Sequence, residues 1–281
     1  MSGTLYLCAT PIGNLEDITY RVIKTLQEVD IIAAEDTRHT IHLLNHFDIK
    51  TPMTSYHEFN KYKKAETLVE KLLAGTNIAL VTDAGTPGIS DPGEELVRQA
   101  HAAGIPVTSL PGACACITAL TMSGLPTRRF CFEAFLPTDK KQRAEILEEL
   151  KTETRTVILY EAPHHLEALL QELYETLGER NLTLCKELTK KHEKVMQTTL
   201  SEAIDFYKEE APRGEYVLVL EGVSRDQLQE DARAQWLQLS LQEHMDLYLS
   251  QDIPKKEAMK KVARDRGMTK RDVYQMLLEE N

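Results

Sequence analysis

The chain has 281 residues, 42% of them hydrophobic, and a formal net charge of -11 at pH 7. It has no apolar run of about 18 residues and no basic segment followed by an apolar core at its start, so we expect a cytoplasmic protein without a membrane span. The five cysteines lack paired spacing, which argues against a disulfide framework or a zinc site. We therefore expect no metal.

The first 110 residues alternate short apolar runs with amphipathic segments. The apolar runs predict strands at 5–9, 31–34, 78–81 and 107–110, and the segments between them predict helices. This alternation indicates a largely parallel sheet with helices on both faces. Pro111 and Gly112 then open a further helix through Ile117 and Leu120.

A second α/β segment follows, in which strands and helices alternate less strictly. Strands are predicted at 130–135, 156–160, 182–185, 195–198 and 216–220, which favours a mixed sheet. Past Gly222 the pattern is helical, with breaks at Pro254 and Gly267 and a cap at Thr269. The predicted fold class is α/β, with α/β domains at 1–117 and 118–225 and a small helical, helix-turn-helix-like domain at 226–281.

The densest run of turn residues lies at 82–93, between a predicted strand and a predicted helix. We expect Asp91 to be the helix N-cap, and Gly85 and Gly88 to adopt positive φ and let the backbone approach a ligand. Small-residue turns at 10–14 and 111–116 also follow predicted strands. Turns that converge in this way can line a cleft for a nucleoside-like ligand. The alternative is an ordinary surface turn.

Charged side chains follow several predicted strands. Glu35, Asp36, Glu161, Glu187 and Lys190 are the candidates for a general base. Each also has a structural interpretation, because carboxylates cap helices or favour their first turn and lysine-rich loops are usually solvated. The sequence does not rank the five.

The C-terminal helices carry a local positive charge on an acidic chain. Residues 251–273 hold eight lysines and arginines against four acidic residues, a local charge of +4. This asymmetry indicates an anionic partner such as RNA, although a segment that only supports a dimer or the main body explains it equally well. The candidate RNA contacts are Arg38, Lys255, Lys256, Lys260 and Lys261.

Six motifs together resemble one family. They are Thr10 to Ile18, Glu35 to Arg38, Asp83 to Gly93, Leu110 to Gly112, Glu187 to Lys190 and Gly214 to Val217. In this order they are similar to the ribosomal RNA small subunit methyltransferase I family of the tetrapyrrole methylase superfamily. The resemblance spans residues 4–222.

The resemblance implies S-adenosylmethionine bound in a cleft between two α/β domains, and a homodimer. The implied substrate is a cytidine ribose 2′-hydroxyl in the decoding region of small-subunit rRNA, presented by the RNA itself or by the assembled subunit. The implied cofactor contacts, besides Gly85 and Gly88, are Pro11, Ile12, Thr86, Ile89, Cys114, Ala115, Tyr160, Leu188 and Tyr216. Two positions depart from the family's usual arginines, namely His165 and Lys186.

Two other functions use the same features. A methylase of a small molecule, such as a tetrapyrrole, could use the same cleft, but a small substrate would not need the basic helical tail. A noncatalytic ribosome-binding protein would need the tail but not S-adenosylmethionine. Binding of this cofactor and the nature of the methyl acceptor discriminate among the three.

Overall fold

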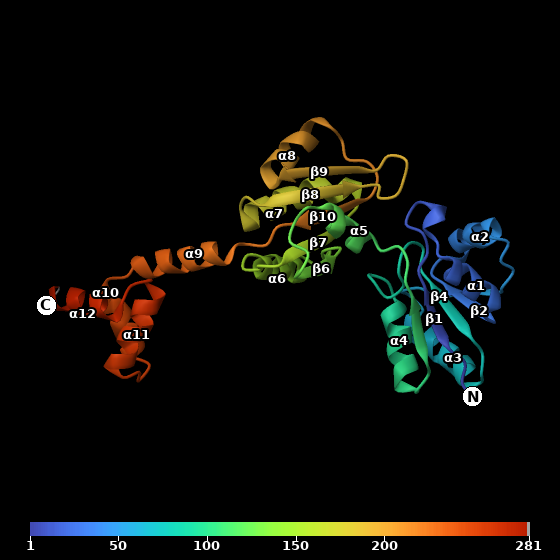
Figure 1. Cartoon of the computed structure of the whole chain (residues 1–281), viewed down its shortest axis with the longest axis horizontal. Helices are drawn as coiled ribbons and strands as arrows, with labels where there is room; N and C mark the ends of the chain where they lie inside the picture. The colour runs from blue at the N-terminus through green and yellow to red at the C-terminus, as the bar shows by residue number, and fades with distance from the viewer. Residues whose placement is uncertain (280–281) are drawn as a thin grey trace. The chain divides into compact units, whose positions relative to one another are not determined.

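The computed structural model describes residues 1–279, which form two compact units (Figure 1). The first unit comprises residues 1–150 and 155–221 and contains two five-stranded sheets. The second comprises residues 151–154 and 222–279 and is helical. Within residues 1–279, none of the helices has the length and apolar content needed to cross a membrane.

The first sheet is entirely parallel, with the strand order β3-β2-β4-β1-β5. Its strands are β1 (Leu5–Cys8), β2 (Ile31–Ala34), β3 (Met53–Ser55), β4 (Ile78–Val81) and β5 (Val107–Leu110). The helices that connect them are η1 (Leu15–Asp17), α1 (Tyr20–Glu28), α2 (Thr37–His46), α3 (Lys61–Leu73) and α4 (Gly93–Ala102). The predicted parallel sheet is confirmed. Only β3 was not predicted, because its three residues are too few to form an apolar run.

Both faces of the first sheet are covered, as β4 shows. Ile78 and Leu80 belong to the core on the side of α3 and α4, whereas Ala79 and Val81 belong to the core on the side of α1 and α2. A strand that is buried on both faces needs apolar residues at every position. This is why β4 is an uninterrupted apolar run in the sequence.

The second sheet is mixed, with the order β6-β7-β10-β8-β9. Only β6 and β7 pair in parallel, which confirms the predicted mixed sheet. Its strands are β6 (Phe130–Ala134), β7 (Thr156–Glu161), β8 (Asn181–Lys186), β9 (Lys194–Thr199) and β10 (Tyr216–Leu220). The helices around it are α5 (Ala115–Met122), α6 (Lys140–Leu150), η2 (Pro163–His165), α7 (Leu166–Leu177) and α8 (Leu200–Glu209).

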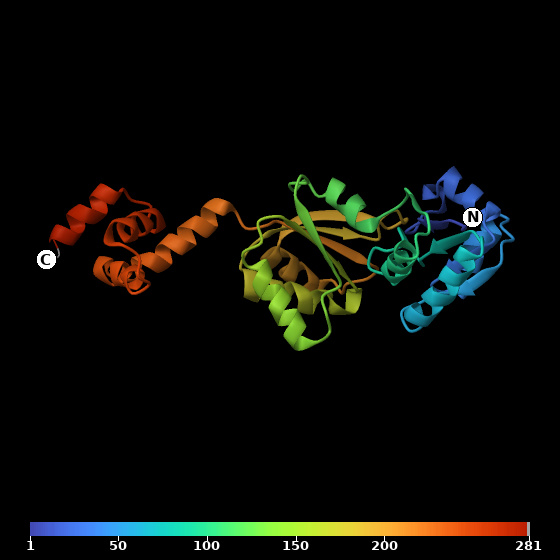
Figure 2. The ribbon, with the colours of Figure 1, turned by 90° about the horizontal axis from the view of Figure 1, so that it is seen from below.

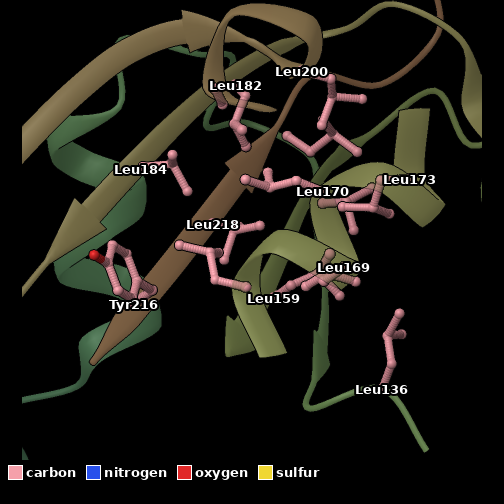
Figure 3. Packing of buried hydrophobic residues seen from close by; sticks show 14 of the residues in the cluster. Leu136, Leu159, Leu169, Leu170, Leu173, Leu182, Leu184, Leu200, Tyr216 and Leu218 are labelled. Atoms are coloured by element: carbon pink, nitrogen blue, oxygen red, sulfur yellow. The ribbon is translucent and has the colours of Figure 1, made fainter. Parts of the chain in front are cut away.

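The two faces of the second sheet have different partners. A leucine-rich core lies between one face and helices α6, α7 and α8 (Figure 3). The other face packs Ile158, Val217 and Val219 against α5, and Ile12 from the loop after β1 joins this cluster. In Figure 2, α5 (green) and α6 (yellow-green) lie on opposite faces of the sheet. The loops after β1 and β5 are thereby held against the second sheet.

The helical unit consists of α9 (Arg225–Leu237), α10 (Leu241–Leu249), α11 (Lys255–Asp265) and α12 (Lys270–Glu279). Leu241, Met245, Val262 and Val273 are buried in its core. The predicted breaks at Pro254 and Gly267 are confirmed, and the Thr269 hydroxyl accepts a hydrogen bond from the Asp272 amide as a cap should (3.2 Å). The division into three domains stays a prediction.

Because Leu218 is completely buried in the leucine-rich core (Figure 3), we expect Leu218→Ala to destabilise the first unit. The expected loss is about 2–5 kcal/mol, from lost transfer free energy and the cavity left behind. Leu73→Ala is the matched control, since Leu73 is 53% exposed on α3. Urea unfolding followed by circular dichroism measures both variants, and equal midpoints would contradict the assigned core.

Candidate functional site

Backbone contacts join the loop after β1 to the loop after β4. The Thr10 amide donates to the Gly85 carbonyl (2.9 Å), and the Gly85 amide donates to the Thr10 carbonyl (3.1 Å). Gly85 has φ +89°, and a Cβ there would lie 3.3 Å from the Ile12 side chain. The Thr86 hydroxyl donates to the Ala113 carbonyl (2.9 Å), which ties in the loop after β5. The three small-residue turns therefore converge, as the sequence predicts.

The predicted role of Asp91 as an N-cap is wrong, because α4 begins at Gly93 and its N-cap is Pro92. The Asp91 carboxylate instead closes the loop from inside, accepting hydrogen bonds from the amides of Gly88 (2.8 and 2.9 Å) and Gly93 (2.7 Å). Burial raises the pKa of Asp91, against the effect of these amides. Two amides of the loop are thus bound by one carboxylate and are not available to a ligand.

A cavity of about 520 Å³ lies where the three loops meet the second sheet. Its volume is in the range of small-molecule and cofactor sites. Nine of the eleven residues predicted to contact a cofactor line it: Ile12, Gly85, Thr86, Ile89, Cys114, Ala115, Tyr160, Leu188 and Tyr216. The other two lie elsewhere, since Pro11 lines a second cavity and Gly88 is bonded to Asp91.

The second sheet contributes an aromatic wall to the cavity. The rings of Phe132 and Phe135 meet Tyr160 edge-on, with centroids 4.9 and 5.6 Å away. The Tyr160 hydroxyl accepts a hydrogen bond from the Cys116 amide at the start of α5 (3.0 Å). Phe135 also lines the cavity although 55% of it is exposed. The hydrogen bond from α5 therefore holds Tyr160 in place, and the wall offers ring surface to a ligand.

Two thiols lie at the start of α5. The sulfur atoms of Cys114 and Cys116 are 3.4 Å apart, and Cys114 lines the cavity. The hydrogen bond from Cys116, with help from the amides of Ile117 and Cys116, lowers the pKa of the Cys114 thiol to about 6 despite its burial. The same hydrogen bond raises the pKa of Cys116. Cys114 is therefore the more acidic thiol and faces the cavity.

The ends of β2 and β4 are joined by reciprocal hydrogen bonds. Glu35 accepts from the Thr82 hydroxyl (2.6 Å), and Asp83 accepts from the Asp36 amide (3.1 Å). Glu35 lines the cavity, whereas Asp36 is the N-cap of α2 and also binds the Arg38 guanidinium (2.7 Å). The bonds to Arg38 lower the pKa of Asp36. The structural interpretation of Asp36 as a cap is confirmed.

Glu161 ends β7 and lines the cavity with only 7% of its surface exposed. It accepts a hydrogen bond from the Ala162 amide (2.8 Å), and Nδ1 of His165 lies 3.7 Å from it. His165, at a position where the resemblance implies an arginine, thus lies beside this carboxylate. Lys186, the second such position, has its ammonium 5.9 Å from the centroid of the Tyr216 ring, in cation–π range.

Glu187 and Lys190 belong to an ion-pair cluster beside the cavity. The Lys190 ammonium binds Glu187 (3.0 Å) and Glu215 (2.8 Å). Burial alone would lower the pKa of Lys190, but these two bonds outweigh it and raise the pKa. The Glu215 amide and then Lys190 lower the pKa of Glu187. Both groups are therefore held in their charged forms.

Two glycines make room for this cluster. A Cβ at Gly13 would lie 2.4 Å from Lys190, and one at Gly214 would lie 2.5 Å from Glu187. Gly214 also has φ +80°. Since Gly13 follows β1 and Lys190 follows β8, the lysine side chain crosses from the second sheet to the first loop.

Several cavity residues were not predicted from the sequence as site residues, among them Asp83, Asp91 and Phe135. Asp83 was accessible in principle, because it directly follows the strand end that carries the loop. Phe135 had no such signal, as it only extends an apolar strand. Within residues 1–279, no group of three or more histidine, cysteine or acidic side chains is arranged to hold a metal ion.

The candidate RNA contacts lie at the surface of both units. Arg38 is exposed on α2 and paired with Asp36. On α11, Lys255, Lys256 and Lys260 are exposed, whereas Lys261 is partly buried with its ammonium 5.4 Å from the centroid of the Tyr248 ring.

Comparison with known proteins identifies the family. Residues 4–204 match the model of the Tetrapyrrole (Corrin/Porphyrin) Methylases. Proteins named "Ribosomal RNA small subunit methyltransferase I" from Halalkalibacterium halodurans and Bacillus subtilis are 50% and 47% identical to the chain. The alignments cover 99% and 97% of this chain and 96% and 93% of those proteins.

Solved structures agree in fold. A uroporphyrin-III-C-methyltransferase from Thermus thermophilus has a TM-score of 0.55 and 20% identity, covering 77% of this chain and 94% of that one. A diphthine synthase has a TM-score of 0.62 and 14% identity, covering 78% and 90%. The solved structures share the fold, whereas the family model and the sequence relatives show that the chain is a methyltransferase of the tetrapyrrole methylase family and belongs to the ribosomal RNA small subunit methyltransferase I family within it.

Proposed function

We propose that this protein transfers a methyl group from S-adenosylmethionine to a cytidine ribose 2′-hydroxyl in the decoding region of small-subunit rRNA. The observation that carries the proposal is the 520 Å³ cavity, in which loops from three parallel strands face the aromatic wall of a second sheet. Ligands of open α/β sheets bind at such strand ends. The names of the relatives, at up to 50% identity over nearly the whole chain, support rRNA as the acceptor.

The residues of the cavity fit the proposed cofactor. Its adenosine would lie among small residues and backbone groups of the loops, and the rings of Tyr160 and Phe135 offer stacking surface. Its sulfonium is a cation, which the carboxylates of Glu35 and Glu161 in the cavity wall would attract. When bound, S-adenosylmethionine supplies a methyl group that a hydroxyl oxygen can attack.

The chain's contribution to the reaction is orientation and removal of a proton. Holding the two reactants in line can supply roughly 7–11 kcal/mol of the barrier. The ribose hydroxyl loses its proton as the oxygen–carbon bond forms and the carbon–sulfur bond breaks, so a carboxylate within reach should accept that proton. The group displaced from the transferred methyl would be S-adenosylhomocysteine.

Among the five candidate bases, the geometry favours Glu35 and Glu161. Both line the cavity. Asp36 is held by Arg38 with a lowered pKa, which makes it a weaker base. Lys190 is a cation between two carboxylates and so has no free electron pair, and Glu187, with its lowered pKa, is bonded to it.

We further propose that the exposed lysines of α11 and Arg38 contact RNA phosphates, and that the protein works in the cytoplasm as a homodimer. The local charge of +4 over residues 251–273 supports the RNA contact. The homodimer rests on the family resemblance, and exposed Ile117 and Met122 on α5 are consistent with a protein contact. Sedimentation of the purified protein tests the homodimer.

The proposed function is tested with labelled S-adenosylmethionine and three acceptors, beside a reaction without an acceptor. The acceptors are assembled small ribosomal subunits, naked small-subunit rRNA and a tetrapyrrole precursor. We expect label in the RNA, located by nuclease digestion at one 2′-O-methylcytidine. Label only in the tetrapyrrole would establish the small-molecule alternative, and binding of subunits without transfer would establish a noncatalytic role.

The thiol of Cys114 reports cofactor binding in the unmodified protein. Because its pKa is lowered to about 6, we expect iodoacetamide to alkylate it readily at pH 7 and slowly below pH 6. S-Adenosylhomocysteine should slow this alkylation by covering the cavity. Cys131, outside the cavity, is the internal control. Peptide mass spectrometry measures both rates, and unchanged labelling of Cys114 at saturating ligand would contradict the assigned pocket.

The base is tested by amide substitution. We expect Glu35→Gln or Glu161→Gln to lower kcat by roughly 10² to 10⁴, the usual contribution of a general base, without loss of affinity for S-adenosylhomocysteine, whose sulfur carries no positive charge. Glu167→Gln, at an exposed site on α7, is the matched control. Methyl-transfer kinetics and calorimetry provide the two readouts. Near-normal turnover in both variants would show that neither carboxylate is the general base, so that orientation alone would account for catalysis.

The RNA contact is tested through its salt dependence. Lysine–phosphate contacts release counterions, so changing Lys255, Lys256, Lys260 and Lys261 to Gln should flatten the plot of log affinity against log salt, by up to about 3 in slope. Cofactor affinity should not change. Filter binding of small subunits or rRNA over a salt series measures the slope.

A second quadruple variant separates this local effect from the change in total charge. It changes four lysines of the first unit to Gln: Lys24, Lys63, Lys71 and Lys208. Its salt slope should match that of the wild type. If both variants behave alike, the tail has no specific part in RNA binding.

A further inference from the structure

A second cavity adjoins the first on the side of α2. Its volume is about 320 Å³, and it is lined by the loop after β1, by one face of α2 and by the end of β4. Thr82 and Asp83 line both cavities. A molecule in the second cavity would therefore lie directly beside a molecule in the first, which is the arrangement that a group transfer between two substrates requires.

The α2 wall of the second cavity is a face of histidines. His39, His42 and His46 are spaced three and four residues apart, so they lie on one side of the helix and extend over about 10 Å of its axis. All three are exposed and line the cavity. Within the described residues 1–279, the rings of His39 and His42 make no hydrogen bond, so their nitrogens are available to a ligand.

Imidazole is suited to a nucleic acid ligand. Its N–H donates to phosphate oxygens, and its ring stacks on unpaired bases. A metal ion is not favoured, because no three histidine, cysteine or acidic side chains among residues 1–279 are grouped so as to hold one. Solvated histidines on a helix surface are the ordinary alternative. They would not need a hollow of 320 Å³ that shares a wall with the cofactor cavity.

The wall shared by the two cavities carries the carboxylate of Asp83, which can accept a further hydrogen bond. One oxygen of Asp83 accepts the Asp36 amide (3.1 Å), which leaves the other free of that bond. Burial raises the pKa of Asp83, partly offset by the same amide. The adjoining Thr82 hydroxyl is already bonded to Glu35 (2.6 Å). A ribose hydroxyl at this wall could donate a hydrogen bond to Asp83. Glu35 would lie nearby, because it is bonded to the adjoining Thr82.

We propose that the second cavity receives the acceptor nucleotide of the RNA, with its ribose at the wall of Thr82 and Asp83 and its phosphates along the imidazoles of α2. This inference rests on the proposed function, because it assigns the place of the RNA in the same reaction. In this arrangement Asp83 positions the ribose hydroxyl toward the cofactor cavity. The histidines bind the phosphates of the RNA strand.

Histidine footprinting tests the inference in the wild-type protein. Diethylpyrocarbonate should modify His39, His42 and His46 in the protein with S-adenosylhomocysteine alone, and added small ribosomal subunits or rRNA should protect them. His101, exposed on α4 outside both cavities, is the internal control and should stay reactive. Peptide mass spectrometry measures each site.

A triple variant provides the kinetic test. His39→Gln, His42→Gln and His46→Gln together should raise KM for the RNA substrate by about tenfold or more, as loss of hydrogen bonds to charged groups predicts. The affinity for S-adenosylhomocysteine should not change. His101→Gln is the matched control and should have wild-type KM.

The outcomes separate this inference from the proposed function. Methyl transfer to RNA by the wild type, without protection of the α2 histidines and with unchanged KM in the triple variant, would overturn the inference alone. Absence of transfer to any RNA would overturn the proposed function and this inference with it. Protection of the three histidines but not of His101, together with the raised KM, is the result expected.

Discussion

The site depends on the paired backbone hydrogen bonds between Thr10 and Gly85. They form because β1 and β4 are neighbours in a parallel sheet, so the loops that follow them leave from the same edge. Glycine is needed at position 85, since a side chain at φ +89° would be strained and would press on Ile12. Once these two loops are joined, Ile12 is available to pack against the second sheet. The cavity lies between the joined loops and the second sheet.

The charged groups near the cavity are held by two different kinds of contact. Hydrogen bonds across the ends of β2 and β4 hold the carboxylates of Glu35 and Asp83, which line the cavity walls. By contrast, Glu187 and Lys190 neutralise each other in a cluster that needs glycine at two positions. The two groups of acidic residues looked alike in the sequence. Their partners make one a source of bases and the other a structural link between the sheets.

Much of the fold was predictable because burial leaves a direct trace in the sequence. A strand such as β4 is apolar at every position because both of its faces are covered. Short β3 left no such trace. Asp91 was misassigned because a carboxylate before proline and glycine looks like a helix cap, whereas three-dimensional closure of the loop uses it for two amides. Asp83 and Phe135 belong to the cavity through contacts between distant segments, which periodicity does not report.

The central claim is that the cavity between the three loops and the second sheet holds S-adenosylmethionine. A crystal structure of the protein with S-adenosylhomocysteine tests it most directly. We expect the ligand against Gly85 and Thr86 on one side and Tyr160 and Tyr216 on the other, with its sulfur facing the wall at Asp83. A ligand bound outside this cavity, or crystals that stay empty at saturating concentration, would rule out the assigned cofactor site.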